Sequence, residues 1–351
     1  MKVALTFNVK PESETFLQEL SPVQKNAQHQ PEKAVDTYAE WDTWETIISI
    51  KNALALHNDV ELVEANELAF EKFKEIQPDI VFNFAEGLKN ISREAQIPAM
   101  LDMLDIPYTG SDPLTLATCL DKARTKEILT YHGIPNSKFI LADKIEKIKN
   151  HNLRFPLIVK PYSEGSGKGI FSTSYVKSDA ELEREANRVI SEYAQPALIE
   201  EFLPGREFTV AVLGNDDEAE VLPIVEINFS DFPEDFIPIY SYEAKWILDT
   251  KENPLDVFTC PAEISNDLEI QIKNTVLNAY KTLRCRDWSR IDVRLDSNNI
   301  PNIIEVNPIP GILPNPEDNS CFPKAARTVG LNYVDMVNKV LYVAAKRHKL
   351  L

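Results

Sequence analysis

The stretch of the sequence with the most chemistry is WSRIDVRLDSNNIPNIIEVNPIPG, residues 288–311. Two alternating segments flank the turn DSNN, a pattern that predicts a β-hairpin. A register that pairs Asp292 with Glu305 also pairs Arg290 with Asn307, so two carboxylates, an amide and a guanidinium share one face. Such oxygen ligands suit Mg²⁺, which fills its shell with nucleotide phosphates. The alternative is a solvated polar face, although the Pro/Gly turn that follows can aim backbone N–H groups at a ligand.

A second stretch, LIVKPYSEGSGKGIFS at residues 157–172, predicts a buried strand that runs into a glycine-rich loop. Gly165, Gly167 and Gly169 match neither the P-loop spacing nor the G-x-G-x-x-G motif of dinucleotide-binding proteins. The loop is therefore either a flexible connection between strands or a phosphate-binding loop of another kind. Lys160 favours phosphate, because a lysine that ends an apolar strand needs a partner for its charge.

Three further groups of residues give weaker functional signals when each is taken alone. The acidic residues of the stretch 200–207 form either a solvated strand end or a place for adenine and ribose. Lys245 is either a surface lysine or a phosphate contact, and Lys122 and Lys126 have the pattern of helix-surface charges. None of the five histidines lies in these stretches, which argues against a histidine-centred nucleophilic mechanism.

Composition limits the function classes. The chain has 351 residues, 44% of them apolar and 26% charged, as in an ordinary globular protein of two or three domains. Its net charge of −18 argues against nucleic acid or an anionic membrane as a partner. The four cysteines form no C-x-x-C pair, which disfavours structural zinc and a disulfide framework. We find no signal peptide or membrane span, and we expect a cytoplasmic protein.

The first third of the chain alternates between strands and helices. The predicted strands cover 2–9, 59–65 and 78–84, and the predicted helices cover 42–57, 67–76 and 92–104. This order predicts parallel βαβ units, whose ligands bind at the carboxyl ends of the strands, near Asn8, Asn83 and Glu86. Asp42 and Glu45 have the spacing of a capping box at the first helix.

The rest of the chain predicts α+β structure. The expected helices cover 113–132, 179–193, 267–283 and 332–346, and the expected strands before the hairpin cover 138–141, 155–162, 196–203 and 206–214. Within the hairpin, Ile304 and Val306 are expected on the apolar face. The span 229–258 is long and contains prolines, which is typical of a lid or of a disordered segment. We predict three domains, at residues 1–109, 110–199 and 200–351.

The order of these motifs resembles that of the D-alanine–D-alanine ligases, members of the ATP-grasp superfamily of carboxylate–amine ligases. The matching stretches are YTGSDPLTLATCLDKARTK, LIVKPYSEGSGKGI, ALIEEFLPGREFTV, YSYEAKW with FTCPA, WSRIDVRLD and IIEVNPIPG. The resemblance runs from about residue 78 to the C-terminus. It implies an ATP-grasp fold of α/β and α+β type, with an N-terminal parallel α/β domain and the nucleotide between the central and C-terminal domains. It also implies that the glycine-rich loop folds over the triphosphate, and that the chain forms a homodimer.

The resemblance implies a role for each matching residue. The implied ATP contacts are Lys122, Lys160, Gly165, Gly167, Lys168, Glu200, Glu201, Phe202, Leu203, Glu207 and Lys245. The implied ligands of two Mg²⁺, with Mn²⁺ as the alternative metal, are Asp292, Glu305 and Asn307. The implied catalytic residues are Arg290 and the Gly311 backbone for the oxyanion, Lys245 for the γ-phosphate, and Ser166. The implied substrate residues are Glu40, Glu86, Arg93 and Ser320.

The implied reaction is an ATP-dependent ligation. One substrate carboxylate attacks the γ-phosphorus to give an acyl phosphate and ADP, and an amine then displaces phosphate. Positioning and charge neutralisation carry most of the phosphoryl step, which fits a site rich in cations and metal ligands.

The resemblance breaks down in the first-substrate region. The chain reads TFNVKPES where the family has a Gly-Gly-x-Ser stretch, and Glu86 stands where the family has histidine. SREA replaces an acidic glycine turn and brings Arg93 close to Glu86 in the sequence. We therefore predict a ligase that joins amino acids or a peptide and whose substrates differ from two D-alanines. The alternatives are a true D-alanine–D-alanine ligase of cell-wall synthesis and a non-catalytic nucleotide-binding homologue.

Overall fold

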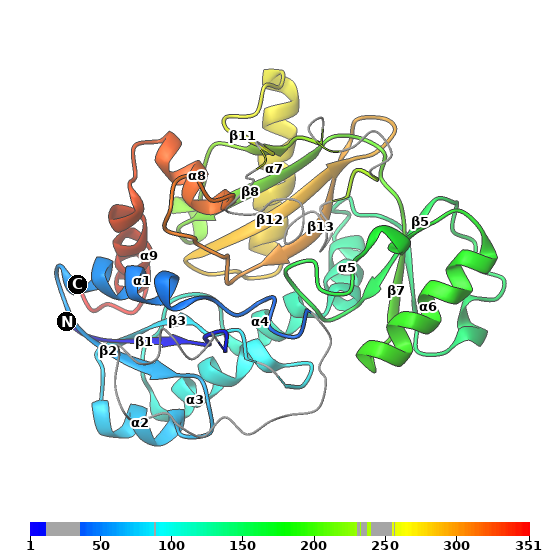
Figure 1. Cartoon of the computed structure of the whole chain (residues 1–351). Helices are drawn as coiled ribbons and strands as arrows, with labels where there is room; N and C mark the ends of the chain where they lie inside the picture. The colour runs from blue at the N-terminus through cyan, green and yellow to red at the C-terminus, as the bar shows by residue number, and fades with distance from the viewer. Residues whose placement is uncertain (12–35, 88, 230–231, 233–236, 240–254, 256) are drawn as a thin grey trace.

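The structure is a computed structural model that describes residues 1–11, 36–87, 89–229, 232, 237–239, 255 and 257–351. Lys245 and most of the span 229–258, where the sequence predicts a lid or disorder, lie outside the described residues. Within these residues, three sheets organise the fold (Figure 1).

The first sheet is parallel, as the βαβ pattern predicts. Its strands, in spatial order, are β2 (Asp59–Glu64), β1 (Lys2–Phe7) and β3 (Ile80–Phe84). The side chains of β1 alternate, so that Val3 and Leu5 pack on one face and Ala4 on the other. The helices of this part are α1 (Trp44–Ala55), α2 (Ala69–Ile76), the 3-10 turn η1 (Arg93–Ala95) and α3 (Gln96–Leu104).

The second sheet is antiparallel and contains the glycine-rich loop. Its strands, in spatial order, are β4 (Phe139–Ala142), β7 (Ala197–Glu201), β5 (Leu157–Pro161) and β6 (Tyr175–Val176). The loop connects β5 to β6, and α6 (Asp179–Tyr193) packs its apolar face against β5. The predicted domain boundary at residues 199 and 200 falls inside β7.

The third sheet is antiparallel and carries the predicted hairpin. Its strands, in spatial order, are β11 (Phe258–Thr259), β10 (Val225–Ile227), β8 (Glu207–Leu213), β12 (Trp288–Leu295) and β13 (Pro301–Asn307), and β9 (Glu220–Val221) also pairs with β8. The remaining helices are α4 (Pro113–Leu120), α5 (Lys122–Tyr131), α7 (Asn266–Thr282), α8 (Cys321–Thr328) and α9 (Tyr333–Arg347).

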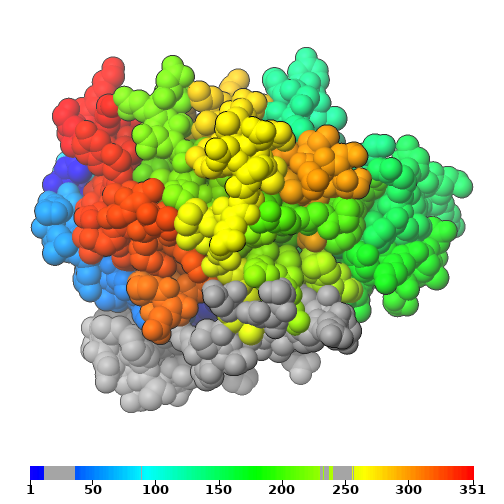
Figure 2. Space-filling model, turned by 90° about the horizontal axis from the view of Figure 1, so that it is seen from above, coloured from blue at the N-terminus to red at the C-terminus, as the bar shows by residue number. Residues whose placement is uncertain are grey.

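One apolar core joins the two ends of the chain. Helix α9 packs against α1, and the core combines side chains of the first sheet with side chains of the third sheet, α8 and α9. The second sheet and α6 (blue-green to green, at the right of Figure 2) lie on the opposite side of the molecule from α9 (red, at the left). Within the described ranges, no helix is long and apolar enough to cross a membrane.

Two local predictions are wrong, and one helix was missed. The helix predicted over 113–132 is two helices, because Asp121 has an extended ψ of 93° and its side chain caps α5 by accepting from the Arg124 N–H. The capping box at Asp42 does not form; Thr43 is the N-cap residue of α1, and its hydroxyl accepts from the Thr46 N–H. Helix α8 was not expected.

Candidate active site

The hairpin of β12 and β13 has the predicted register. Arg290 pairs with Asn307, and Asp292 pairs with Glu305. A β-bulge follows the second pair and leaves Ile304 without a partner, so its side chain lines a pocket and does not join the core as expected.

The polar side chains of the hairpin contact one another. Nε of Arg290 lies 3.2 Å from Asp292 Oδ1, and Nη2 of Arg290 lies 3.5 Å from Glu305 Oε1. The amide of Asn307 lies 3.3 Å from Glu305 Oε1. Burial opposes the charge of Arg290, but its carboxylate neighbours raise the pKa of the guanidinium above its usual range. The arginine is therefore a fixed positive charge in this cluster.

The donor set of the hairpin fits a divalent metal. Asp292 and Glu305 offer two carboxylates, and the Asn307 amide N–H donates to both. A flip of that amide would turn its oxygen toward them, and Mg²⁺ prefers such a set of oxygen ligands. Among the described residues, no group of three or more His, Cys, Asp or Glu side chains could hold a metal by itself. The cluster therefore fits a metal whose remaining ligands come from water and from a bound phosphate.

A buried ion cluster lies beside the hairpin. Glu200 on β7 lies 2.5 Å from the Nζ atoms of both Lys126 and Lys160, and it also accepts from the Ser137 hydroxyl at 2.8 Å. Burial would raise the pKa of Glu200, but the two lysines outweigh it and lower the pKa to about 2. Lys126 is 1% exposed, so the prediction of a helix-surface charge at that position is wrong.

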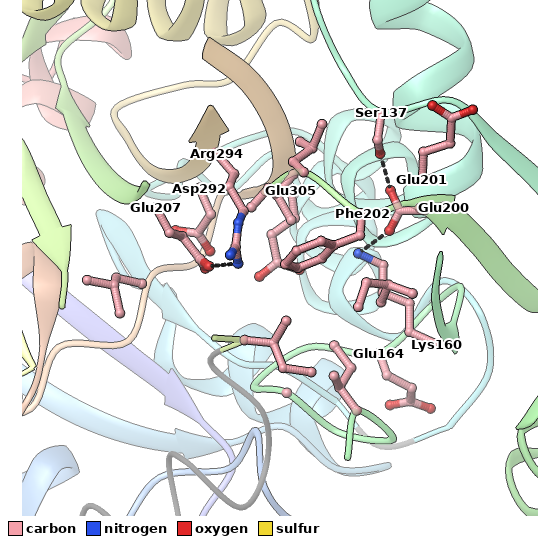
Figure 3. Close-up of a pocket in the computed structure, with 17 residues that line it drawn as sticks. Ser137, Lys160, Glu164, Glu200, Glu201, Phe202, Glu207, Asp292, Arg294 and Glu305 are labelled. Carbon is pink, nitrogen blue, oxygen red and sulfur yellow. Dashed lines mark hydrogen bonds and ion pairs between the residues drawn. The ribbon is translucent and has the colours of Figure 1, made fainter. Parts of the chain in front are cut away.

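The first pocket lies between the second and third sheets (Figure 3). Predicted residues that line it are Lys160, Gly167, Glu200, Glu201, Phe202, Leu203, Glu207, Asp292 and Glu305. Arg294 also lines it, and its guanidinium stands 4.6 Å from the centre of the Phe202 ring and 2.6 Å from Glu207. A flat aromatic ring and a carboxylate between two sheets suit a base and a sugar hydroxyl.

The glycine-rich loop contacts the part of the chain that contains the first sheet. The backbone N–H of Gly165 donates to Glu40 Oε1 at 2.5 Å, and Arg93 Nη2 lies 2.5 Å from the same oxygen. Lys122 donates to the Glu164 carbonyl and lies 3.5 Å from Glu305 Oε2. The loop therefore lies next to both the metal-ligand cluster and the predicted substrate residues.

The second pocket has a volume of about 540 Å³, within the range of roughly 300–1,000 Å³ that is typical of small-molecule sites. Predicted residues that line it are Glu40, Glu86, Lys122, Gly165, Ser166, Arg290, Asp292, Asn307, Gly311 and Ser320. Ser320 is 6% exposed, and its hydroxyl accepts from the Leu313 N–H at 3.1 Å. Asp292 lines both pockets, so the two pockets meet at the metal-ligand cluster.

Three predicted residues have other contacts. Lys168 lies 2.8 Å from Glu164, and Glu201 lies 2.8 Å from the exposed Arg154. Arg93 is 5% exposed and lies behind the wall of the second pocket, where it holds Glu40.

Sequence reasoning missed several polar residues at the site, among them Lys126, Ser137, Arg294, Glu94 and Asp42. Arg294 shares a strand face with Arg290 and Asp292, and that alternation was a usable signal. The others carry no local signal, because distant strands bring them to the site.

Comparisons with known proteins identify relatives of the chain. The family model described as "D-ala D-ala ligase C-terminus" matches residues 127–342. A D-alanine–D-alanine ligase of Pelotomaculum thermopropionicum is 32% identical over 307 residues, which cover 85% of this chain and 88% of the relative. A protein of Sinorhizobium fredii named "Uncharacterized protein y4sG" is 35% identical over 269 residues, 77% of this chain and 75% of the relative.

The fold has a solved counterpart. The structure of a D-alanine–D-alanine ligase of Bacillus anthracis with ATP superposes with a TM-score of 0.70 at 21% identity, over 100% of this chain and 99% of the other. The protein therefore has the ATP-grasp fold, as the sequence predicts. The chain belongs to the D-alanine–D-alanine ligase family. It is an ATP-dependent ligase that forms C–N bonds.

Proposed function

We propose that this ligase joins two amino acids, or an amino acid and a peptide, through an acyl phosphate. One observation carries the proposal: the two pockets share Asp292, on the hairpin that gathers the metal ligands and Arg290. ATP in the first pocket would direct its γ-phosphate toward substrates in the second. We also propose one domain for each sheet, close to the predicted bounds 1–109, 110–199 and 200–351, with the second boundary moved past Glu201 so that β7 stays in the second domain.

Most of the ATP contacts in the proposal come from the first pocket. The adenine would lie beside Phe202 and Leu203, and its ribose beside Glu207. Lys160 and Lys122 would contact the phosphates beneath the glycine-rich loop. Both lysines also contact carboxylates, Glu200 and Glu305 respectively, so each is held in place before ATP arrives. Lys245 is proposed for the γ-phosphate from the resemblance alone.

Metal ions complete the proposed ATP site. Asp292, Glu305 and Asn307 would hold two Mg²⁺, which when bound neutralise phosphate charge. Arg290 and the Gly311 N–H would face the oxyanion that develops on the substrate carboxyl carbon. Ser320 and Ser166 line the same pocket and would contact the substrate carboxylate and the phosphate.

The acyl transfer needs two steps. The carboxylate oxygen of the first substrate attacks the γ-phosphorus, and ADP leaves. The uncharged amine of the second substrate then attacks the acyl carbon, the C–O bond to phosphate breaks, and the amine proton goes to solvent or to a nearby base. Arg290 would stabilise negative charge in both steps, because its charge is fixed.

The substrates are the open part of the proposal. Glu86 lines the second pocket where the family has histidine, and Arg93 holds Glu40 behind the pocket wall. Both features favour substrates other than two D-alanines. A true D-alanine–D-alanine ligase is the second candidate, since relatives carry that name over most of the chain.

The test is phosphate release from Mg-ATP with a panel of D- and L-amino acids and dipeptides, with mass spectrometry of the products. Release with D-alanine alone identifies the second candidate, and release with other substrates supports the proposal. ATP binding with no release from any substrate on a broad panel contradicts ligase chemistry.

A variant pair tests the metal assignment. Glu305→Gln should lower phosphate release at least a hundredfold, because Mg-ATP is misplaced. The control is Glu127→Gln on α5, whose side chain is 51% exposed and pairs with Arg124. Turnover of Glu305→Gln near that of the control would contradict the assignment.

A further inference from the structure

One wall of the second pocket is built from three carboxylates of the first domain. Asp42 precedes α1, Glu86 follows β3, and Glu94 lies in η1. All three line the pocket, and Glu94 is only 8% exposed. We call these three residues the acidic wall.

The carboxylates of the acidic wall are not paired within the part of the chain that the structure describes. None of the three makes a side-chain hydrogen bond or an ion pair with another described residue. Arg93, which acts on both Glu86 and Glu94, already has other partners: it lies 2.5 Å from Glu40, 2.8 Å from the Ser163 carbonyl and 3.6 Å from Glu164.

The groups around the wall leave it short of positive charge. Glu86 faces the carboxylates of Glu94, Glu40 and Asp42, against the single cation of Arg93. Burial, and then this repulsion, raises the pKa of Glu86 well above its usual value.

The negative charges of Glu94 and Asp42 are also poorly balanced by nearby cations. Burial raises the pKa of Glu94 to about 7, although Arg93 and Lys122 oppose the shift; the carboxylates of Glu40 and Glu305 add to it. Burial raises the pKa of Asp42 to about 7 as well, and its opposing cation is Lys10. Buried carboxylates without partners are costly, and a bound cation would offset that cost.

Once ionised, the three carboxyl groups of the wall carry more negative charge than one ammonium group needs. Glu94 interacts with Lys122 and Glu305, which belong to the metal end of the pocket, whereas Asp42 interacts with Lys10 instead. A neutral amino acid brings a single ammonium, which Glu94 alone can take. The methyl side chain of alanine would leave Asp42 and Glu86 without a partner.

We propose that the acidic wall binds a positively charged side chain, so that the first substrate of this ligase is a basic amino acid. The inference rests on the proposed function, because it places the substrate in the second pocket. Binding of the cation favours the ionised wall, and protons leave the carboxyl groups for the buffer.

The test compares probes that differ in charge and little in shape. Titration calorimetry of the full chain with Mg²⁺ and ADP would measure the affinity for each probe. Arginine is compared with citrulline and lysine with norleucine, each in both the D and the L configuration. In one configuration, the charged probe should bind about tenfold tighter or more than its neutral partner. At pH 7 the charged probe should also release protons, seen as a dependence of the binding enthalpy on the buffer.

Variants locate the effect. Glu94→Gln, Glu86→Gln and Asp42→Asn should each reduce the preference for arginine over citrulline severalfold and reduce proton release. The control is Glu75→Gln, an exposed carboxylate of α2 in the same domain. Using three separate variants keeps the test valid if one of them fails to fold.

The outcomes separate the two proposals. Equal affinity of charged and neutral probes, no binding of any probe, or an unchanged preference in all folded variants overturns the acidic wall as a cation site. Phosphate release with neutral amino acids in that case would leave the ligase proposal intact. A charge preference without phosphate release would support the wall and contradict the ligase proposal.

Discussion

Glu200 holds two buried ammonium groups, and the change Glu200→Gln tests how much this cluster stabilises the second sheet. Lys126 is 1% exposed and Lys160 is 4% exposed, and both lie 2.5 Å from the carboxylate. Glutamine has nearly the same shape but no charge, so the change leaves two buried cations without a counter-ion. Breaking a buried pair in this way costs on the order of 3–5 kcal/mol.

The pKa of Glu200 gives an independent magnitude. The usual value of 4.5 falls to about 2 in the folded chain. At about 1.4 kcal/mol per pH unit, the ionised carboxyl contributes roughly 3 kcal/mol to the free energy of unfolding. Because the folded pKa is the lower one, this stability is present above pH 4.5 and is lost as the pH falls toward 2.

Hydrogen exchange is the suitable assay, because it reads one sheet in a protein with several domains. At pH 7 the slowest amides of β5 and β7 should exchange more than a hundredfold faster in Glu200→Gln. The control is Glu201→Gln, the next residue, whose partner Arg154 is 80% exposed and contributes about 0–1 kcal/mol. Equal effects of the two changes would refute the reasoning.

Two further predictions concern the proposed ATP site. Arg294→Met removes the guanidinium that lies on Phe202 and pairs with Glu207, so the KM for ATP should rise about tenfold with a smaller change in kcat. The control is Arg206→Met, which removes a more exposed ion pair with Glu226. An equal rise of KM in the two variants would contradict the role of Arg294. Gly169→Ala should slow phosphate release at subsaturating ATP, because φ is +76° and the new Cβ would lie 2.4 Å from Pro161 Cγ. The control is Gly133→Ala, where φ is a similar +69° but the new Cβ would have no atom within 4 Å. It therefore separates the backbone strain of a positive φ from the collision with Pro161. Equal rates of phosphate release in the two variants would show that the collision does not matter.

The sequence predicts the hairpin well because its pairing is local. A short turn fixes which residues of β12 and β13 face each other, so the contacts of Arg290, Asp292, Glu305 and Asn307 follow from alternation alone. The bulge at Ile304 is a departure of one residue from this alternation. Alternation cannot reveal such a bulge.

Burial of charge was not predictable from local pattern. Lys126 has the spacing of a surface residue on α5, and only the arrival of β7 places a carboxylate beside it. The acidic wall has the same origin, because Asp42 and Glu94 come together only when the first domain folds. Patterns of period 2 and 3.6 report which face is apolar, but they do not report which distant charge covers a polar face.

The second pocket has opposite charge at its two ends, and this asymmetry would orient a substrate. Arg290 and Lys122 lie beside the metal ligands, and the acidic wall lies in the first domain. An amino acid that entered with its carboxylate toward the wall would meet unpaired negative charge, whereas the opposite orientation pairs charges at both ends. That orientation brings the substrate carboxylate to the ATP end, where the proposed reaction needs it. The same charges that select a basic substrate would therefore also position it for phosphoryl transfer.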